Sequence, residues 1–512
     1  MTKPPILIFG VPSSGTTLVR TILNCHPHIA GGPEAPWLAN HASHNVMALY
    51  ESLTTGELSY AQNFGVPPAQ VLSRLRQLVD GLFTDFAVSQ GKQRWAHKTP
   101  DDCLYVDFFT QLFPEAKYLH IIRHPLDVAL STARIPPHRR GVNPWHEKNV
   151  ILEAHCPVAN TLFHNVVRWR RWNDQVRAGL RAVDSKQVSY EALVTEPEKT
   201  FAALFEFLDE PFSPEILDYS RFNTIFPSWE WGSVDVRQTN KITASRIGRW
   251  KTELTQEEAR MLLSVAGIDA EQRVPPPPVP ACRLASIDEL RAPLFAGFTE
   301  GLNTFASQFS LSTFEERPEN WEHAWLWFTG LYSAIGTGKR VITINSGLSP
   351  LPWLIALLGA EVTIIETNQA WIPQWDALRR KLRVKVDWQI AAEALPLPEK
   401  LADVVISLSV IEHQPDKTKA IAELARVLKP DGVLAMSFDL CEKSQGMTYP
   451  GGNSRALTMA EFEREIWFHP AFGNREKPQW NLADIPAFQA WHLRSASHHN
   501  YVVGAAVLVK RR

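Results

Sequence analysis

Cysteine is scarce in this chain, and the few cysteines are not paired in sequence. The 512 residues contain five of them, and no two form a Cys-x-x-Cys motif. Such motifs are typical of zinc sites and redox dithiols, whereas many evenly spaced cysteines are typical of small secreted domains. The sequence therefore predicts no metal site and no disulfide framework, and it favours a reducing compartment.

The chain also lacks an excess of charge and a long apolar run. Fifty-two basic and fifty-four acidic residues give a formal net charge of −2, so no overall positive field would attract nucleic acid or anionic lipid. The longest apolar run, Trp353 to Ile365, contains Glu361 and is too short to span a bilayer. A strand-like run begins at residue 6, which leaves no room for a signal peptide. We expect a cytoplasmic protein without membrane or nucleic-acid partners.

What the chain does have is length and a regular alternation of elements. A chain of 512 residues exceeds the roughly 250 to 300 residues at which single cores stop growing. The run VPPPPVP at 274–280 supports neither a helix nor a central strand. The sequence therefore predicts domains at 1–273 and 284–512, joined by a linker at 274–283. Strand-like and helix-like segments alternate in both halves, which predicts two α/β domains with largely parallel sheets.

A loop of small residues follows the first strand-like run. Its residues include Pro12, Ser13, Ser14, Gly15, Thr16 and Thr17, and apolar residues at helical spacing begin at Leu18. A strand, a loop and a helix in this order direct backbone N–H groups and the positive helix end at one point, which suits a phosphate. Thr16 stands where a nucleotide triphosphate P-loop has its lysine, which disfavours a kinase or an ATPase. Taken alone, a loop of this kind is more often a plain strand-to-helix connection than a phosphate site.

A second strand-like run, from Lys117, ends in an arginine. Arg123 closes this run and Ser131 follows eight residues later. Ligands of open α/β sheets bind outside the carboxyl ends of the strands, so Arg123 is expected beside the first loop. Its planar guanidinium would suit a second phosphate. The alternative is a surface arginine paired with Asp127.

Together these segments resemble the sulfotransferases that use 3′-phosphoadenosine 5′-phosphosulfate (PAPS), and the branch with the tyrosylprotein sulfotransferases is the most similar. The resemblance covers roughly residues 5 to 265. It implies that the loop at 10–17 holds the 5′-phosphosulfate and that Arg123 and Ser131 hold the 3′-phosphate. The resemblance also covers the segments at 188–193 and 246–251. It implies that five of their residues contact PAPS, namely Tyr190, Ile247, Gly248, Arg249 and Trp250. Ser13 stands where that branch often has an arginine.

Sulfuryl transfer needs a base for the acceptor hydroxyl and a cation for the charge that grows on the leaving oxygen. The resemblance implies Lys98 as the cation and Glu34 as the base. Some other sulfotransferases use a histidine as base, which leaves His97 as the alternative. His124, between Arg123 and a proline, is interpreted as a structural residue.

The second half shows a new series of alternating elements. Strands are predicted at Arg340–Asn345, Glu361–Glu366, Asp403–Leu408 and Tyr501–Val509, and a helix at 416–429 with Asp416 as its N-cap and Pro430 to Gly432 as its stop. An acid that ends the second parallel strand is where dinucleotide-type sheets hold a ribose diol. Glu366 has that place.

The second half resembles class I S-adenosylmethionine (SAM) methyltransferases over roughly residues 335 to 510, which implies a Rossmann-like domain after a P-loop-like one. The resemblance implies that Gly347 and Glu366 contact SAM. The glycine-rich loop of that family is altered, with Thr343, Asn345 and Ser349 at its other characteristic positions, and Ala391 stands where an acid often meets the adenine. His413 is a candidate base or a residue that caps its loop.

We therefore predict a bifunctional enzyme of specialised metabolism. It would transfer a sulfuryl group from PAPS to an acceptor hydroxyl and a methyl group from SAM to the same or a related small molecule. The alternative is a sulfotransferase that carries a methyltransferase-like binding module without catalytic activity. A P-loop kinase is disfavoured by Thr16.

Overall fold

A computed structural model of the chain describes residues 3–39, 45–134, 161–222, 241–268, 280–314, 318–391, 395–441, 456–474, 476–478, 480–495 and 501–511. The chain forms two compact units, one of residues 1–153 and 168–253 and the other of residues 154–167 and 254–512. Residues 274–279 of the predicted linker lie outside the described residues, and residues 281–283 belong to the strand Ala281–Leu284 of the second unit. Among the described helices, none is long and apolar enough to cross a membrane.

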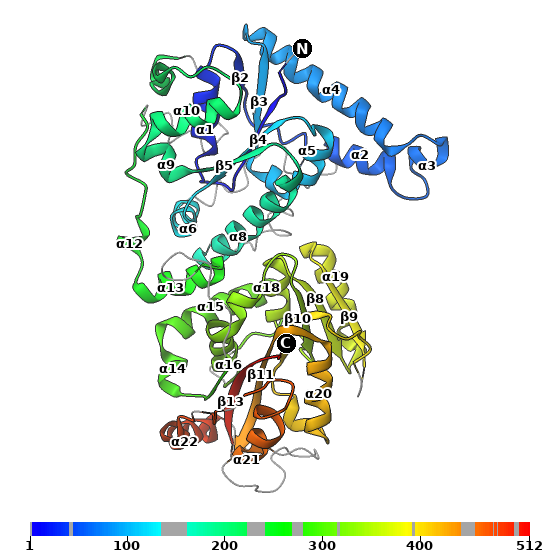
Figure 1. Cartoon of the computed structure of the whole chain (residues 1–512), viewed down its shortest axis with the longest axis vertical. Coiled ribbons are helices and arrows are strands. Elements are labelled where there is room, and N and C mark those ends of the chain that lie inside the picture. Colours follow the sequence, from blue (N-terminus) through cyan, green and yellow to red (C-terminus); the bar gives the residue numbers. More distant parts are fainter. Residues whose placement is uncertain are drawn as a thin grey trace. The chain divides into compact units, whose positions relative to one another are not determined.

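The first unit is built on a five-stranded sheet in which every pair of neighbours is parallel. The strand order is β2-β3-β1-β4-β5 (Figure 1). The strands are β1 (Ile6–Phe9), β2 (Ile29–Gly31), β3 (Arg94–Lys98), β4 (Lys117–Ile122) and β5 (Ser185–Ser189). This arrangement confirms the predicted parallel sheet.

Helices cover both faces of this sheet, with α1, α9 and α10 on one side and α4 and α5 on the other (Figure 1). The described α-helices of this part of the chain are α1 (Thr16–Cys25), α2 (Val46–Thr54), α3 (Tyr60–Phe64), α4 (Pro68–Ser89), α5 (Val106–Leu112), α6 (Pro125–Ala133), α8 (Leu162–Gly179, which crosses the boundary of the units), α9 (Tyr190–Thr195), α10 (Pro197–Phe207) and α12 (Trp250–Glu253). Successive side chains of β1 point to opposite faces of the sheet. Ile8 packs in the apolar core between the sheet and α1, and Phe9 packs on Phe109 of α5 in the core on the other face.

The order of the strands brings three chain segments to one edge of the first sheet. β1 lies between β3 and β4, and its Ile8 pairs with Lys98 while Phe9 pairs with His120. The loop after β1, the end of β3 and the end of β4 therefore meet at the carboxyl edge, where open α/β sheets bind ligands.

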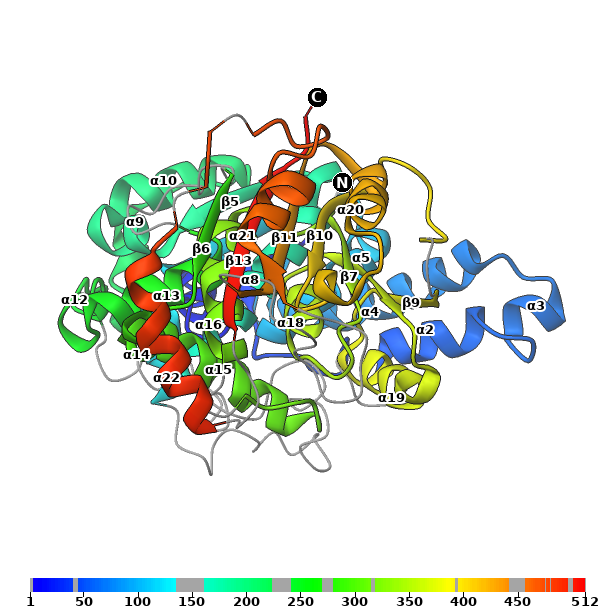
Figure 2. The same ribbon diagram turned by 90° about the horizontal axis from the view of Figure 1, so that it is seen from below.

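The second unit contains an eight-stranded sheet, in the order β6-β13-β11-β10-β7-β8-β9 with β12 beside β11. Figure 2 shows β6, β13, β11, β10 and β7 side by side. The strands are β6 (Ala281–Leu284), β7 (Arg340–Ile344), β8 (Glu361–Glu366), β9 (Val386–Ile390), β10 (Ala402–Ser407), β11 (Leu428–Cys441), β12 (Leu457–Thr458) and β13 (Val502–Val509). β13 is antiparallel to both neighbours, and the other pairs are parallel. The predicted Rossmann-like sheet is confirmed.

The described helices of the second unit are α13 (Gln256–Ala266), α14 (Ile287–Arg291), α15 (Pro293–Gln308), α16 (Pro318–Leu326), α17 (Tyr332–Ala334), α18 (Leu351–Leu357), α19 (Ile372–Leu382), α20 (Lys417–Val427), α21 (Met459–Glu461) and α22 (Ile485–Ser495). α13 packs on α15 and therefore groups with this unit, whereas the sequence assigns it to the first domain; the predicted domain limits stay a prediction.

The helix expected at 416–429 is α20, and Asp416 caps it by accepting the N–H of Lys419. The predicted stop at Pro430 to Gly432 is wrong. The helix ends at Val427, because Leu428 already pairs with Ala402 at the start of β11.

Candidate active site

A cavity of about 410 Å³ in the first unit is lined by residues from the carboxyl edge of the sheet. Predicted site residues in its lining are Pro12, Ser13, Gly15, Thr16, Thr17, Glu34, Lys98, Arg123, Ser131, Tyr190 and Arg249. The structure thus brings together residues that lie up to 237 positions apart in the chain (from Pro12 to Arg249). The residues predicted for the sulfotransferase site that lie outside this lining are Ser14, His97, Ile247, Gly248 and Trp250.

The loop after β1 ends at an α1 amino terminus that is left open for an anion. Gly15 is the N-cap, with φ of +97°, and neither a side-chain cap from a described residue nor an acidic residue of the first turn satisfies the first N–H groups. Such groups and the helix dipole favour negative charge. A Cβ on Gly15 would lie 2.3 Å from Cδ2 of Tyr190, so only glycine fits beneath this ring. Ser14 is fully buried below the loop, with Oγ 2.6 Å from the position of a Cβ on Gly10.

Arg123 joins three parts of the cavity wall. Its Nη1 donates to the Ser13 carbonyl at 2.9 Å, and its Nη2 donates to the Arg246 carbonyl at 2.7 Å. Its guanidinium lies over the ring of Tyr190, 4.6 Å from the centroid. Nε is buried and has no hydrogen-bond partner among the described residues. These carbonyl contacts differ from the alternative pairing with Asp127, whose oxygens accept N–H groups of 248 and 250 instead.

Lys98 and Glu34 form a hydrogen-bonded ion pair through Nζ and Oε1. The side chain of Lys98 is 1% exposed and that of Glu34 is 21% exposed, so the carboxylate is the partner that solvent and an acceptor can reach. The two residues that the sequence selected as cation and base therefore touch each other in the cavity.

The loop that carries Glu34 is held by residues the sequence analysis did not select. Arg20 of α1 donates through Nη1 to the Gly32 carbonyl at 3.1 Å, and Asn24 accepts the N–H of Gly31 at 3.0 Å. Beyond Glu34, the N–H of Ala35 donates to Thr99 Oγ1 at 3.0 Å. Helix α1 and the end of β3 thus fix the carboxylate from both sides.

His97 lies behind the cavity wall. Successive side chains of a strand point to opposite faces, so His97 points away from the cavity that Lys98 lines. Its Nε2 is 2.6 Å from Oδ2 of Asp102, and both residues are buried. Burial raises the pKa of Asp102 to about 6. His97 is therefore placed as a neighbour of the site, without access to an acceptor. His124 stacks on Trp250 at 5.0 Å between ring centroids, in line with a structural role.

Several lining residues were not among the predicted site residues. They are Leu18, Pro100, Arg134, Val194, Tyr219, Lys241, Ile242, Thr243 and Arg246. Lys241 and Arg246 lie in or near the basic segment at 246–251, which carries part of the resemblance. This position is the only sequence signal that could have selected them. Among the described residues of the lining, cations outnumber acids, since Glu34 is the one carboxylate there.

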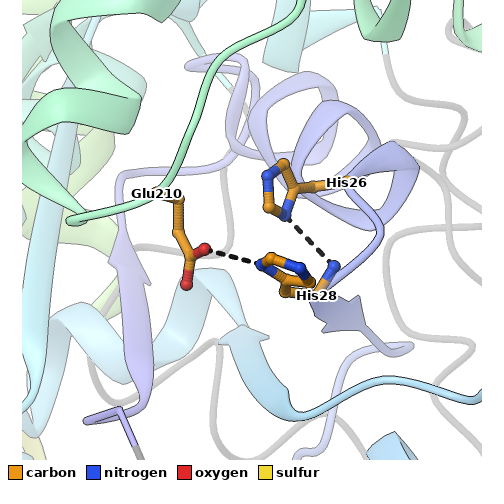
Figure 3. Close-up of side chains that lie close together, drawn as sticks. All are labelled: His26, His28 and Glu210. Carbon is orange, nitrogen blue, oxygen red and sulfur yellow. Dashed lines mark hydrogen bonds and ion pairs between the residues drawn. The ribbon is translucent and has the colours of Figure 1, made fainter.

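One cluster among the described residues brings ligand atoms close enough for a metal ion, namely His26, His28 and Glu210 (Figure 3). Both ring nitrogens of His26 are already used: Nδ1 accepts the His28 N–H at 3.2 Å, and Nε2 donates to the Pro211 carbonyl at 3.0 Å. Glu210 pairs with His28, Arg94 and Lys3. These donors and charges do not fit a cation, and they tie α1 to the chain after α10.

In the second unit, the predicted ribose carboxylate is used by its own loops. Oε2 of Glu366 accepts the N–H of Gly347 at 3.0 Å, and Oε1 accepts those of Thr367 at 2.9 Å and Asn368 at 3.4 Å. Glu366 is buried. The Gly347 carbonyl accepts from Trp375 Nε1 at 3.0 Å.

The cavity beside this loop is small. It measures about 60 Å³, and its lining includes Asn345 and Ala391 but neither Gly347 nor Glu366. His413 lies at the end of the short helix Ile411–His413 and does not line this cavity either.

Comparison with known proteins matches each unit to a family. Residues 4–214 match the sulfotransferase family, and residues 346–436 match a methyltransferase domain. Nodulation protein NoeE of Sinorhizobium fredii is 26% identical over 301 residues, which cover 52% of this chain and 64% of the relative. Protein-tyrosine sulfotransferase A of Caenorhabditis elegans is 26% identical over 225 residues, 43% of this chain and 53% of the relative.

For the second unit, the ubiquinone biosynthesis O-methyltransferase of Pseudomonas putida is 36% identical over 103 residues, 20% of this chain and 44% of the relative. Each of these three alignments spans less than two thirds of the relative. The chain is thus a fusion of transferase domains. It joins a sulfotransferase domain at 4–214 to a methyltransferase domain at 346–436.

Proposed function

We propose that the first unit transfers the sulfuryl group of PAPS to the hydroxyl of a small-molecule acceptor. The observation that carries this proposal is one cavity with an open helix terminus, a buried arginine and a paired lysine and glutamate. Each of these groups has a separate task in sulfuryl transfer.

The residues of the cavity fit the donor. Its volume of about 410 Å³ lies within the roughly 300 to 1,000 Å³ of small-molecule sites. The N–H groups of the α1 terminus suit one phosphate-type group, and Arg123 with its buried Nε suits another. Arg246 and Arg249 add positive charge from a neighbouring segment. When bound, PAPS supplies the sulfuryl group.

The chain's own residues then handle a proton and a charge. Glu34 takes the proton of the acceptor hydroxyl at a carboxylate oxygen, because it is reachable from the cavity and no other acid is found among the described lining residues. Lys98 donates a hydrogen bond to the oxygen on which negative charge grows. Before the acceptor arrives, Lys98 Nζ donates to Oε1 of Glu34, which holds the two side chains next to each other in the cavity.

The test is turnover of PAPS with 4-nitrophenol and with a tyrosine-containing peptide as acceptors. We expect Glu34→Gln and Lys98→Met each to lower turnover on the order of 10²- to 10⁴-fold, while the exposed Glu57→Gln serves as the matched control. Near-normal turnover of Glu34→Gln with bound PAPS would exclude Glu34 as the base.

For the second unit we propose the alternative of the two predicted functions, a module that does not transfer methyl groups. The described residues do not fit SAM. The oxygens of Glu366 accept three backbone N–H groups and the hydroxyl of Thr367, which uses the roughly four acceptor sites of a carboxylate. The cavity of about 60 Å³ is far below the roughly 300 Å³ at the small end of ligand sites.

Calorimetry with S-adenosylhomocysteine, the product of methyl transfer, tests this proposal on the full chain. We expect no binding heat at concentrations that saturate ordinary SAM sites. A stoichiometric site would restore the bifunctional prediction.

A further inference from the structure

The segment at 241–253 supplies three cations to the cavity but has little regular structure of its own. Lys241, Arg246 and Arg249 belong to the lining, and the segment's one helix is the four-residue α12. A segment of this kind depends on contacts with its neighbours for its position. The source of those contacts therefore decides where the cations lie.

Ile242 and Ile247 of the segment pack against the apolar core around α1 and α9, and the polar contacts of the turn come from the chain that follows β4. Arg123 Nη2 donates to the Arg246 carbonyl at 2.7 Å. The ring of His124 stacks on Trp250, with 3° between the ring planes. The strand end that places Arg123 in the cavity thus also holds the neighbouring segment at two points.

Asp127 provides the central contact. Its Oδ2 accepts the N–H of Gly248 at 2.7 Å, and its Oδ1 accepts that of Trp250 at 3.4 Å. The side chain is buried, with 2% of the residue exposed. Gly248 has φ of +70°, which makes the turn that presents both N–H groups to one carboxylate.

We propose that Asp127 is a positioning residue for donor binding. It acts through the segment, because fixing the turn at 248–250 fixes Arg249 within the turn and Arg246 just before it, where the Arg246 carbonyl accepts from Arg123. This inference rests on the proposed function. It assigns to Asp127 a task beyond that of an acid in the first turn of α6, where it also meets the positive end of the helix.

The test compares Asp127→Asn with Asp107→Asn, an exposed acid in the first turn of α5. In Asp127→Asn the amide NH₂ opposes one of the two backbone N–H groups. Calorimetry on the full chain uses two probes, adenosine 3′,5′-bisphosphate and 5′-AMP, which lacks the phosphate expected beside Arg123.

We expect Asp127→Asn to weaken bisphosphate binding roughly 10- to 100-fold, the effect of one charge-assisted hydrogen bond, and to leave 5′-AMP binding unchanged. Gly248→Ala should show the same pattern, because it disturbs the turn from the other side and leaves α6 intact. Asp107→Asn should bind both probes like the unchanged chain.

Two results would overturn the inference. One is unchanged bisphosphate binding by Asp127→Asn. The other is an equal loss of affinity of Asp127→Asn for both nucleotides together with a lower unfolding temperature. That result would show that Asp127 only stabilises α6. If the unchanged chain does not bind the bisphosphate at all, the proposed function itself fails, and the inference falls with it.

Discussion

Replacing Gly15 by alanine tests the phosphate loop at its tightest point. Gly15 has φ of +97°, and an added Cβ would lie 2.3 Å from Cδ2 of Tyr190. The backbone strain alone costs about 1–2 kcal/mol. Tyr190 must also move, and this disturbs its contact with Arg123, whose guanidinium is 4.6 Å from the ring centroid. If one charge-assisted contact to the ligand is lost, the Kd for adenosine 3′,5′-bisphosphate rises roughly 10- to 100-fold.

The matched control is Gly56→Ala. Gly56 has φ of +87°, and nothing lies within 4 Å of an added Cβ. The Gly56→Ala variant should lose about 1–2 kcal/mol of stability from backbone strain but keep its affinity for adenosine 3′,5′-bisphosphate. Thermal unfolding and calorimetry on the three proteins separate the two effects. If Gly15→Ala binds the bisphosphate as tightly as Gly56→Ala does, the loop does not hold the ligand as argued.

Two further substitutions test buried carboxyl groups. Burial raises the pKa of Asp102 in the folded state from 3.8 to about 6, so the folded state binds more protons than the unfolded state between pH 4 and 6. Relative to Asp102→Asn, the free energy of unfolding should therefore fall by up to about 3 kcal/mol as the pH rises from 4 to 6. A difference in unfolding free energy between the two proteins that stays constant with pH in denaturant titrations would contradict this. Glu366→Gln should lower the stability of the second unit by about 1–3 kcal/mol in thermal unfolding, because Glu366 accepts three N–H groups, with exposed Glu399→Gln as the control; equal stability of these two variants would argue against that role.

Much of the first site could be predicted from sequence, because its main parts follow from local patterns. The strand, loop and helix around Gly15 are adjacent in the chain, and Arg123 ends a strand whose side chains alternate. Parallel strands share one carboxyl edge, so both elements had to meet there. The roles of Lys98 and Glu34 relied on the family resemblance, and their ion pair is a finding of the structure, since no spacing connects the two residues.

The sequence could not show which side chains of a strand face the cavity and which are covered by neighbouring elements. His97 and Lys98 are neighbours, and only the packing of β3 shows that Lys98 lines the cavity while His97 meets Asp102. Glu366 likewise stands at the expected strand end, yet loop N–H groups that lie 1 to 19 residues away in sequence occupy it. Long-range hydrogen bonds of this kind leave no periodic signal.

The central claim is that the first unit binds the nucleotide of PAPS, and one titration tests it most directly. Adenosine 3′,5′-bisphosphate is titrated into the full-length chain by calorimetry, alongside Arg123→Ala. The account predicts one site per chain that Arg123→Ala weakens strongly, since Arg123 lines the cavity and contacts Ser13, Arg246 and Tyr190 there. A folded chain that gives no binding heat, or an Arg123→Ala variant that binds as tightly as the unchanged chain, would contradict it.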